Sequence, residues 1–399
     1  MNAPSKHSSP RTPDFDSWPC EKTISAFEFT PDILTLTWSD GVISRYHACW
    51  LADNDPGPAL TNPLTREREV DLDHLPADIA IKEVSLDEDS LHVAWTSGPD
   101  RSSFLPGWLR ANDYSNDRTQ DNDIPARVTW NIHEIPEPPT TDGADVLDND
   151  DTLGAWLEDL QTYGLARLAN VPTEDGMVAK VARRIGPVRE SNFGFTYDVM
   201  IKSDPDSNAY TTLALDSHTD LATREYQPGL QFLHCLKNST EGGQGTMVDG
   251  FRVAEDIRKN RPDYFQILST WNWTFTNRAV DTDYRWNTPL FVLDKEGELS
   301  ELRMTTFLRG PLALPFDQVE KAYEAYRFLI GEIKKDRYRM VFDYRPGDLV
   351  AYDNRRILHG RESFAGSVGE RWLQGCYSER EELHSRLRIL ARHRRAALV

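Results

Sequence analysis

Short apolar segments separated by turns run through the second half of the chain, and they constrain its fold more than any other feature. From about residue 208, segments such as LQFLHCL, WNWTFTN and RWLQGCYS are rich in aromatic and β-branched residues, which is typical of β-strands. Two helical patterns precede them, at 151–164 with Asp151 as the expected N-cap and at 173–186, and each closes on a glycine. Helices followed by many short strands predict a mainly β fold with flanking helices, a double-stranded β-helix (jelly roll).

The N-terminal part of the chain has the character of a separate, small β-rich domain. Residues 23–50 contain three short strand patterns, ISAFEF, ILTLTW and VISRYHACW, and residues 111–126 are polar without periodicity. A further helical pattern at 317–334 interrupts the later strands. We therefore predict a mobile N-terminus at 1–20, a small β-rich domain at 21–115, a linker at 116–127 and the jelly-roll domain at 128–399.

Charge and cysteine content exclude several classes of protein. The net charge is −19, so nucleic acids and anionic membrane surfaces are poor partners. The four cysteines form no C-x-x-C pair, and no apolar run is long enough to cross a membrane or to act as a signal peptide. We expect a cytoplasmic protein with reduced thiols.

Two of the ten histidines stand in contexts that favour metal binding. His218 and Asp220 are two positions apart in LDSHTD, and side chains at that spacing share one face of a strand. His359, at the end of the apolar segment before HGR, could supply the third ligand of a 2-His-1-carboxylate site. Each feature alone is also compatible with ordinary core residues, whereas their combination in one β-rich domain favours a metal site.

Arg371 follows His359 by twelve residues, in the segment GERWLQGCY. A facial triad leaves three metal positions open for a bidentate co-substrate and O2, and the far carboxylate of such a co-substrate needs a cationic anchor. The planar guanidinium suits this role because it binds a carboxylate through two hydrogen bonds.

These residues lie in segments that resemble the Fe(II)- and 2-oxoglutarate-dependent oxygenases of the taurine dioxygenase-like superfamily. Within them, the sequence is most similar to the group of γ-butyrobetaine dioxygenase and trimethyllysine dioxygenase. The resemblance runs over nearly the whole chain. It is carried by AYTTLALDSHTD, GLQFLHCLKNSTEGG, PGDLVAYDNRRILHGRESF and RWLQGCY.

The resemblance implies the reaction and the roles of several residues. Fe(II) would bind His218, Asp220 and His359, and Arg371 would hold the C5 carboxylate of 2-oxoglutarate. With O2, such enzymes convert 2-oxoglutarate to succinate and hydroxylate a second substrate. Many relatives also use a Ser or Thr after Gly-Gly-Asp to hold 2-oxoglutarate; here Gly245 stands there, and Thr246 is the next candidate.

The group's substrates carry a trimethylammonium ion, which aromatic faces bind through cation–π attraction. By motif, the resemblance places Phe193, Tyr197, Tyr210 and Tyr377 around that ion. For the acidic end of the substrate it points to Ser207, to Thr305 or Thr306, and to Arg309. Relatives carry asparagines at the first two of these positions, so γ-butyrobetaine, a phosphonate analogue and trimethyllysine all stay open as the small zwitterionic substrate.

The sequence departs from the group in its N-terminal domain. Relatives usually bind zinc there through three cysteines and a histidine, whereas Asp55, Gly57 and Leu60 stand at the cysteine positions, and WTSGPDRSSF lacks the histidine. His47, Cys49 and His74 lie near but lack zinc-ligand spacing. We predict no zinc.

Two other classes of function remain open. A cupin-like metal enzyme without 2-oxoglutarate would not need Arg371, and a catalytically silent betaine-binding module would not need three metal ligands. Domain 21–115 shows no chemistry of its own and could support a homodimer.

Overall fold

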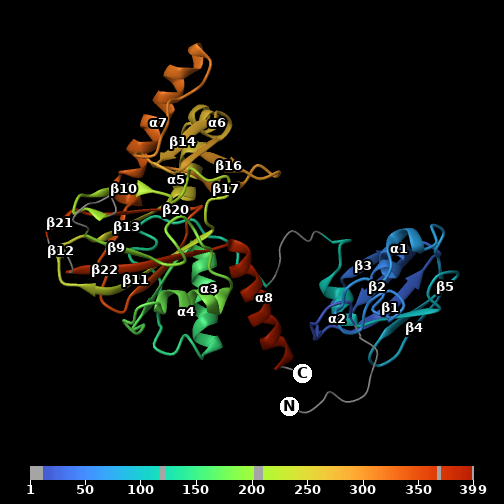
Figure 1. Cartoon of the computed structure of the whole chain (residues 1–399). Coiled ribbons are helices and arrows are strands. Elements are labelled where there is room, and N and C mark those ends of the chain that lie inside the picture. The colour runs from blue at the N-terminus through green and yellow to red at the C-terminus, as the bar shows by residue number, and fades with distance from the viewer. Residues whose placement is uncertain (1–11, 117–122, 202–209, 366–369, 398–399) are drawn as a thin grey trace. The chain divides into compact units, whose positions relative to one another are not determined.

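The computed structural model describes residues 12–116, 123–201, 210–365 and 370–397 (Figure 1). The chain divides into two compact units, Met1–Asp121 with Ile389–Val399, and Asn122–Arg388. The last residues of the chain thus group with the first unit, whereas the sequence-based boundaries assign them to the second.

The first unit contains two three-stranded antiparallel sheets, in the orders β1-β2-β3 and β4-β5-β6. The alternating burial of β2 and β5 reflects one face packed on a shared apolar core that includes Leu36, Val93 and Trp108. The predicted third strand ends early, because residues after His47 begin a helix. The elements are β1 Ile24–Phe29, β2 Ile33–Trp38, β3 Ile43–His47, α1 Ala48–Asp53, the 3-10 helix Leu72–His74, β4 Ile81–Leu86, β5 Leu91–Trp95, β6 Arg101–Phe104 and α2 Pro106–Ala111.

The second unit is built on a four-stranded sheet, β10-β20-β13-β18, and a six-stranded sheet, β7-β8-β19-β11-β22-β9. One apolar cluster contains Met247 and Phe342 from the first sheet and Val350 and Leu373 from the second, so the two sheets face each other across a common core. The strands are β7 Thr140–Asp142, β8 Leu165–Ala169, β9 Tyr197–Met200, β10 Leu215–His218, β11 Leu230–Asn238, β13 Gly245–Asp249, β18 Met340–Phe342, β19 Leu349–Asp353, β20 Ile357–Arg361 and β22 Arg371–Ser378.

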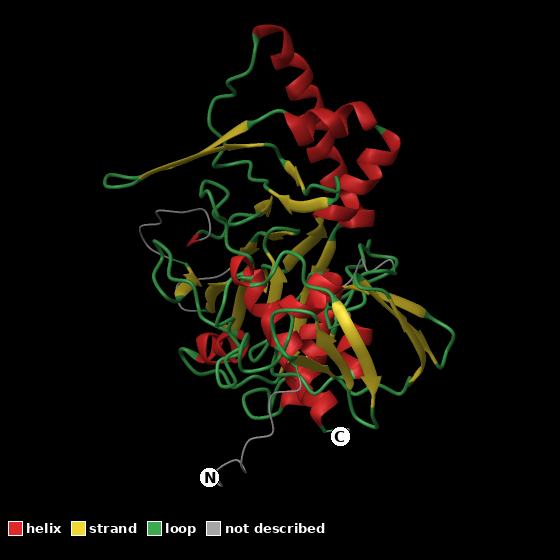
Figure 2. Cartoon of the chain, turned by 90° about the vertical axis from the view of Figure 1, so that its right-hand side faces the viewer, coloured by secondary structure: helices red, strands yellow, loops and turns green. Residues whose placement is uncertain are grey.

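Three two-stranded ribbons and several helices accompany these sheets (Figure 2). The N-cap of α3 is Asn149, whose side chain accepts hydrogen bonds from the N–H groups of Asp151 and Thr152, so the expectation of Asp151 as N-cap is wrong. Gly164 ends α3 at φ 71°, as the sequence predicts. The ribbons are β12 Glu241–Gly242 with β21 Phe364–Ala365, β14 Trp273–Arg278 with β15 Asp283–Thr288, and β16 Phe291–Leu293 with β17 Leu299–Leu302. The helices are α3 Asp150–Tyr163, α4 Met177–Ile185, α5 Gly250–Asn260, α6 Pro262–Thr270, the 3-10 helix Phe316–Gln318, α7 Val319–Ile333, the 3-10 helix Asp336–Tyr338 and α8 Arg380–Ala396.

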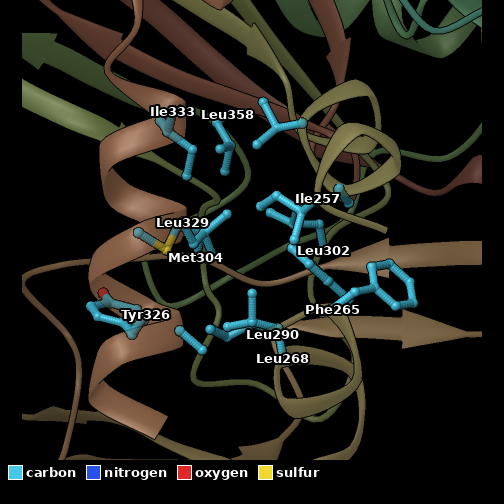
Figure 3. Packing of buried hydrophobic residues seen from close by; sticks show 14 of the residues in the cluster. Ile257, Phe265, Leu268, Leu290, Leu302, Met304, Tyr326, Leu329, Ile333 and Leu358 are labelled. Carbon is cyan, nitrogen blue, oxygen red and sulfur yellow. The ribbon is translucent and has the colours of Figure 1, made fainter. Parts of the chain in front are cut away.

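A second apolar cluster packs against one face of β20. Leu358, which precedes His359 on β20, packs with Ile333 of α7 and Ile257 of α5 (Figure 3). Neighbouring residues of a strand point to opposite faces, so burying Leu358 in this cluster directs His359 to the other face. Met304 and Leu329 extend the same cluster.

Within the described part of the chain, no helix combines the length and the apolar character needed to span a bilayer. The predicted cytoplasmic location stays a prediction.

Candidate active site

The two predicted histidine ligands lie opposite each other on neighbouring strands. His218 ends β10 and pairs in register with His359 of β20, which also pairs with Met247 of β13. Directly opposed residues of an antiparallel pair project to the same face, and the two imidazole rings are 4.2 Å apart between centroids. The ring of Phe307 packs edge-on against His218 at 5.0 Å.

Asp220 lies in the turn after β10, and not on the strand as the His-x-Asp spacing suggested. Asn354 fixes this turn: its Oδ1 accepts the N–H of Asp220 at 2.7 Å, and its Nδ2 donates to the Asp220 carbonyl at 3.0 Å. The next residue, Leu221, has φ 54°, a conformation that costs a bulky side chain about 1–2 kcal/mol. Buried Arg303 supports the strained turn by donating to the carbonyl oxygen of Glu225 at 2.6 Å.

The two carboxylate oxygens of Asp220 have different partners. Oδ1 lies 3.2 Å from Nε2 of His218 and 3.5 Å from Nε2 of His359. Oδ2 accepts hydrogen bonds from Nε2 of Gln231 at 2.8 Å and from the hydroxyl of Tyr377 at 2.7 Å. The carboxylate is therefore held through one oxygen while the other faces both histidines.

The surroundings of Asp220 and His359 favour the protonation states that a bound cation requires. Burial acts to raise the pKa of Asp220, but the neighbouring His359 and His218 outweigh it and hold that pKa well below the usual range. Burial, reinforced by His218, lowers the pKa of His359, which favours the neutral imidazole. Nδ1 of His218 lies 2.8 Å from the carbonyl oxygen of Asp216, an arrangement that leaves Nε2 as the free lone pair.

The donor set fits an octahedral divalent metal. One ligand atom from each of His218, Asp220 and His359 lies within 4.8 Å of the others, and this is the one such group among the described residues. Neighbouring ligands about 2.1 Å from one octahedral ion stand about 3 Å apart, close to the Asp220 separations above. Two histidines and one carboxylate on one face are typical of non-haem Fe(II) oxygenases.

Arg371, the first residue of β22, is a buried cation beside this site. Its Nη2 donates weakly to the Gly243 carbonyl at 3.5 Å, while its Nε has no partner and no carboxylate of the described residues pairs with it. Burial lowers the pKa of Arg371, which shows the cost of holding the cation there. The guanidinium groups of Arg361 and Arg371 both lie over the ring of Phe364, at 4.9 and 5.5 Å. An anionic ligand would offset this buried positive charge.

The structure brings three of the four predicted aromatic residues together. The rings of Tyr197 and Tyr377 are stacked at 5.0 Å, and the Phe193 ring lies 6.0 Å from that of Tyr197. Gly375 makes room for Tyr197, because a Cβ at position 375 would lie 2.5 Å from its ring. The hydroxyls of Tyr197 and Tyr377 reach Gln231 and Asp220, so the stacked pair borders the metal site.

Tyr210, the fourth aromatic, is buried. The segment that follows it is tied to β20, since Nη2 of Arg361 donates to the carbonyls of Thr211 and Leu213 at 2.7 and 2.8 Å. The tether connects the Tyr210 segment to the strand that carries His359.

The remaining predicted residues lie apart from the triad or beyond the described residues. Thr246 pairs with Gly360, so it faces away from His359, as expected for a regular strand. Thr246 and Thr306 line a pocket of about 310 Å³ to which the triad does not contribute. Arg309 is exposed with its guanidinium over Tyr326, and Ser207 lies outside the described residues.

Several residues around the triad could not be identified from the sequence. Gln231, Tyr352 and Asn354 look like ordinary members of the segments LQFLHCL and LVAYDNRR. Tyr352 and Tyr377 both pair with Gln231, so three polar side chains form one row across the sheet. The alternation of β11 puts Gln231 on that inner face, but no local pattern separates it from a solvent-facing glutamine.

The known proteins that this chain resembles in sequence are dioxygenases. The model of the family described as taurine catabolism dioxygenase TauD, TfdA family, matches residues 131–377. The chain is 39% identical to γ-butyrobetaine dioxygenase of Pseudomonas sp. (strain AK-1), over 95% of this chain and 99% of the relative. It is 32% identical to the Homo sapiens γ-butyrobetaine dioxygenase over 90% and 94% of the two chains. It is 30% identical to the mitochondrial trimethyllysine dioxygenase of Mus musculus over 88% and 84%.

Three observations agree with one another. The family model matches most of the chain, the relatives align over nearly their full length, and His218, Asp220 and His359 converge as a possible metal site. The chain therefore belongs to the TauD, TfdA dioxygenase family, as a γ-butyrobetaine dioxygenase-like member of the Fe(II)- and 2-oxoglutarate-dependent oxygenases.

Proposed function

We propose that the protein hydroxylates a small zwitterion with a trimethylammonium group at one end and an acidic group at the other, γ-butyrobetaine or a close analogue. The single observation that carries the substrate class is the stacked Tyr197–Tyr377 pair beside the carboxylate of Asp220. The names of the two γ-butyrobetaine dioxygenases that the chain resembles support the same class.

The finer fold and the metal content are also part of the proposal. The two facing sheets are the walls of a double-stranded β-helix, with the histidines on one sheet and Gln231, Arg371 and Tyr377 on the other. The first unit is a small β-rich domain without zinc, because Asp55, Gly57 and Leu60 offer no thiolate.

The chain's residues divide the work of the reaction. His218, Asp220 and His359 would hold Fe(II), and Arg371 would bind the distal carboxylate of 2-oxoglutarate. The bound iron supplies the activation of O2 that couples 2-oxoglutarate decarboxylation to substrate hydroxylation. Gln231 and Tyr377 orient the Asp220 carboxylate, while the apolar cluster between the sheets excludes bulk water.

Aromatic faces bind a trimethylammonium ion because it cannot donate a hydrogen bond and carries a permanent charge. The ionised Asp220 beside Tyr377 adds a negative field on the same side. Each favourable cation–π contact contributes roughly 0.5–2 kcal/mol. Phe193 and Tyr210 complete the ammonium site in this proposal, and Ser207, Thr306 and Arg309 are its candidates for the acidic end.

The test is a succinate-release screen over trimethylammonium compounds that differ in chain length and in a carboxylate or phosphonate end. Turnover should require the cation. A neutral analogue with a tert-butyl group of the same shape should be hydroxylated far less efficiently, because it removes the charge from every aromatic face at once. Equal turnover of the tert-butyl analogue would refute the betaine class and leave the oxygenase assignment intact.

The same screen separates the alternatives. Betaine binding without 2-oxoglutarate consumption would identify a silent binding module, and turnover of trimethyllysine or a phosphonate alone would reassign the substrate within the class. A net charge of −19 supports a small-molecule partner over nucleic acid or membranes. A homodimer remains a proposal that sedimentation of the full chain would test.

A further inference from the structure

Gly245, the first residue of β13, has no room for a side chain. It pairs with Arg361 and Phe342 and lies two positions from Met247, so it faces the core between the two sheets. A Cβ at position 245 would lie 2.7 Å from Cε2 of Tyr344 and 3.1 Å from Cζ of Phe342. The Tyr344 ring therefore occupies the space that a side chain at 245 would fill.

The hydroxyl of Tyr344 is buried without a hydrogen-bond partner among the described residues. Tyr344 is 4% exposed, so bulk water does not solvate this hydroxyl. Buried hydroxyls in native proteins are nearly always paired, and an unpaired one in an active site calls for a ligand.

Tyr344 and Arg371 are neighbours. Nδ2 of Asn238 donates to the Tyr344 carbonyl at 2.8 Å, and Asn238 pairs in register with Arg371. Burial raises the pKa of Tyr344, and the positive charge of Arg371 is the largest influence opposing it. The Nε of Arg371 is likewise without a partner in the described part of the chain.

Two unpartnered donors on neighbouring buried residues favour an acceptor-rich anion as their ligand. An ionised carboxylate has two oxygens and accepts more hydrogen bonds than one guanidinium edge supplies. We propose that Tyr344 donates its hydroxyl hydrogen to the distal carboxylate of 2-oxoglutarate, next to Arg371. Tyr344 lies two residues after the end of β18, and its ring fills the space left free by Gly245.

The inference rests on the oxygenase assignment and not on the betaine substrate. Its test is Tyr344→Phe, which keeps the ring and removes the donor. Binding is measured by calorimetry without O2 on the Fe(II)-loaded full-length protein, so the readout does not depend on turnover. Because the lost bond joins a hydroxyl to a charged group, the Kd of 2-oxoglutarate should rise about tenfold or more.

A control ligand locates the effect at the distal carboxylate. 2-Oxopentanoate retains the 2-oxo acid but carries a methyl group in place of that carboxylate. Its Kd should be the same for wild type and Tyr344→Phe. A Kd of 2-oxoglutarate that changes less than twofold, or an equal loss for both ligands, would overturn the inference.

A control variant separates binding from folding. Tyr338 is also a buried tyrosine, but its hydroxyl donates to Oδ2 of Asp256 at 2.6 Å. Tyr338→Phe should lower the thermal midpoint of the metal-free protein and leave the Kd of 2-oxoglutarate unchanged. Tyr344→Phe should leave the thermal midpoint of the metal-free protein unchanged and raise the Kd of 2-oxoglutarate. Removing an unpaired hydroxyl costs the metal-free fold no hydrogen bond.

A second unpartnered phenol provides the competing outcome. Tyr352 is fully buried, its ring lies 4.9 Å from that of His359, and its hydroxyl has no partner among the described residues. If Tyr352→Phe weakens 2-oxoglutarate and Tyr344→Phe does not, the donor is Tyr352 and the inference is wrong. Wild-type protein that fails to bind 2-oxoglutarate would instead refute the oxygenase assignment itself.

Discussion

The Asp220 carboxylate shows at the scale of single residues how the site is prepared for a metal. Tyr377 was expected to act through its ring alone, yet its hydroxyl donates to Oδ2 of Asp220 and fixes the orientation of the other oxygen. Gln231 donates to the same oxygen. Groups that orient a metal ligand in this way typically contribute about 10–100-fold to metal affinity.

Replacing Tyr377 by Phe should separate its two roles. The variant keeps the ring against Tyr197 but loses the hydrogen bond to Asp220. We expect Fe(II) affinity to fall about tenfold. The apparent KM for the trimethylammonium substrate, measured at saturating iron, should change little. Unaltered Fe(II) affinity in a competition assay with a chelating dye would show that Gln231 alone positions the carboxylate.

Arg371→Lys keeps the charge beside the site and loses the two-pronged geometry of the guanidinium. Truncating one partner of a buried charged pair costs about 2–5 kcal/mol, and the lysine should cost somewhat less. The apparent KM for 2-oxoglutarate should therefore rise at least tenfold. Arg395→Lys, on a basic residue near the C-terminus, is the matched control and should leave that KM unchanged. A normal KM in Arg371→Lys would mean that another cation holds the co-substrate.

How far residues could be predicted depends on whether their role leaves a local pattern. His218, Asp220, His359 and Arg371 could be proposed from the sequence because ligand chemistry restricts both residue type and spacing. Asn354 and Gln231 act through register and turn geometry, which become visible only when distant strands are paired. The need for glycine at position 245 can be explained only from the structure, in which the Tyr344 ring occupies the space of a side chain there.

At the scale of elements, one face of β11 contributes to the metal site and the other packs in the protein interior. Gln231 points toward Asp220, whereas His234 lies on the opposite face and is fully buried. The strand was predicted correctly because its composition alone is typical of a buried strand. Helices α5 and α6 were not predicted, because residues 250–270 lie between strong strand signals. Their apolar residues can be recognised as helix faces only once they pack in the cluster that contains Leu358 and Leu268.

Burial lowers the pKa of His234 to about 4, against a weaker opposing effect of the Val171 backbone. The His234 imidazole is therefore protonated near pH 6.5 in the unfolded chain but only near pH 4 in the folded protein. The free energy of unfolding should fall as the pH drops through this window, by about 3 kcal/mol for this residue.

Denaturant unfolding of wild type and His234→Leu at pH 7 and pH 5 would test this contribution. The acid-induced loss of stability should be smaller in the variant. His133→Leu, at an exposed histidine, is the matched control and should retain the wild-type loss. An identical loss in wild type and His234→Leu would show that other groups cause the acid sensitivity.

At the scale of the whole molecule, the two units differ in what their converging polar side chains bind. In the first unit they bind the backbone of their own loop, and in the second they are placed to bind a metal. In the first unit, buried Asp55 accepts the N–H of Gly57 at 2.9 Å, and its carbonyl accepts the hydroxyl of Thr61 at 2.8 Å. A Cβ at position 57 would lie 3.2 Å from both carboxylate oxygens, so the side chain of Asp55 fills the centre of the loop. In the second unit the convergent groups are the metal ligands themselves.

The protein should therefore hold one metal per chain, at the triad. A tetrahedral zinc site needs thiolate or imidazole ligands that residues 55–60 do not offer, and hydrogen bonds already satisfy the Asp55 loop. Elemental analysis of wild type prepared without chelators should find at most one transition metal per chain, and His218→Ala should retain almost none. Hydrogen exchange of residues 54–61 should be the same before and after dialysis against EDTA, because no metal cross-links that loop. One zinc ion per chain retained by His218→Ala, with chelator-sensitive exchange in 54–61, would place a structural zinc in the first unit and contradict the prediction.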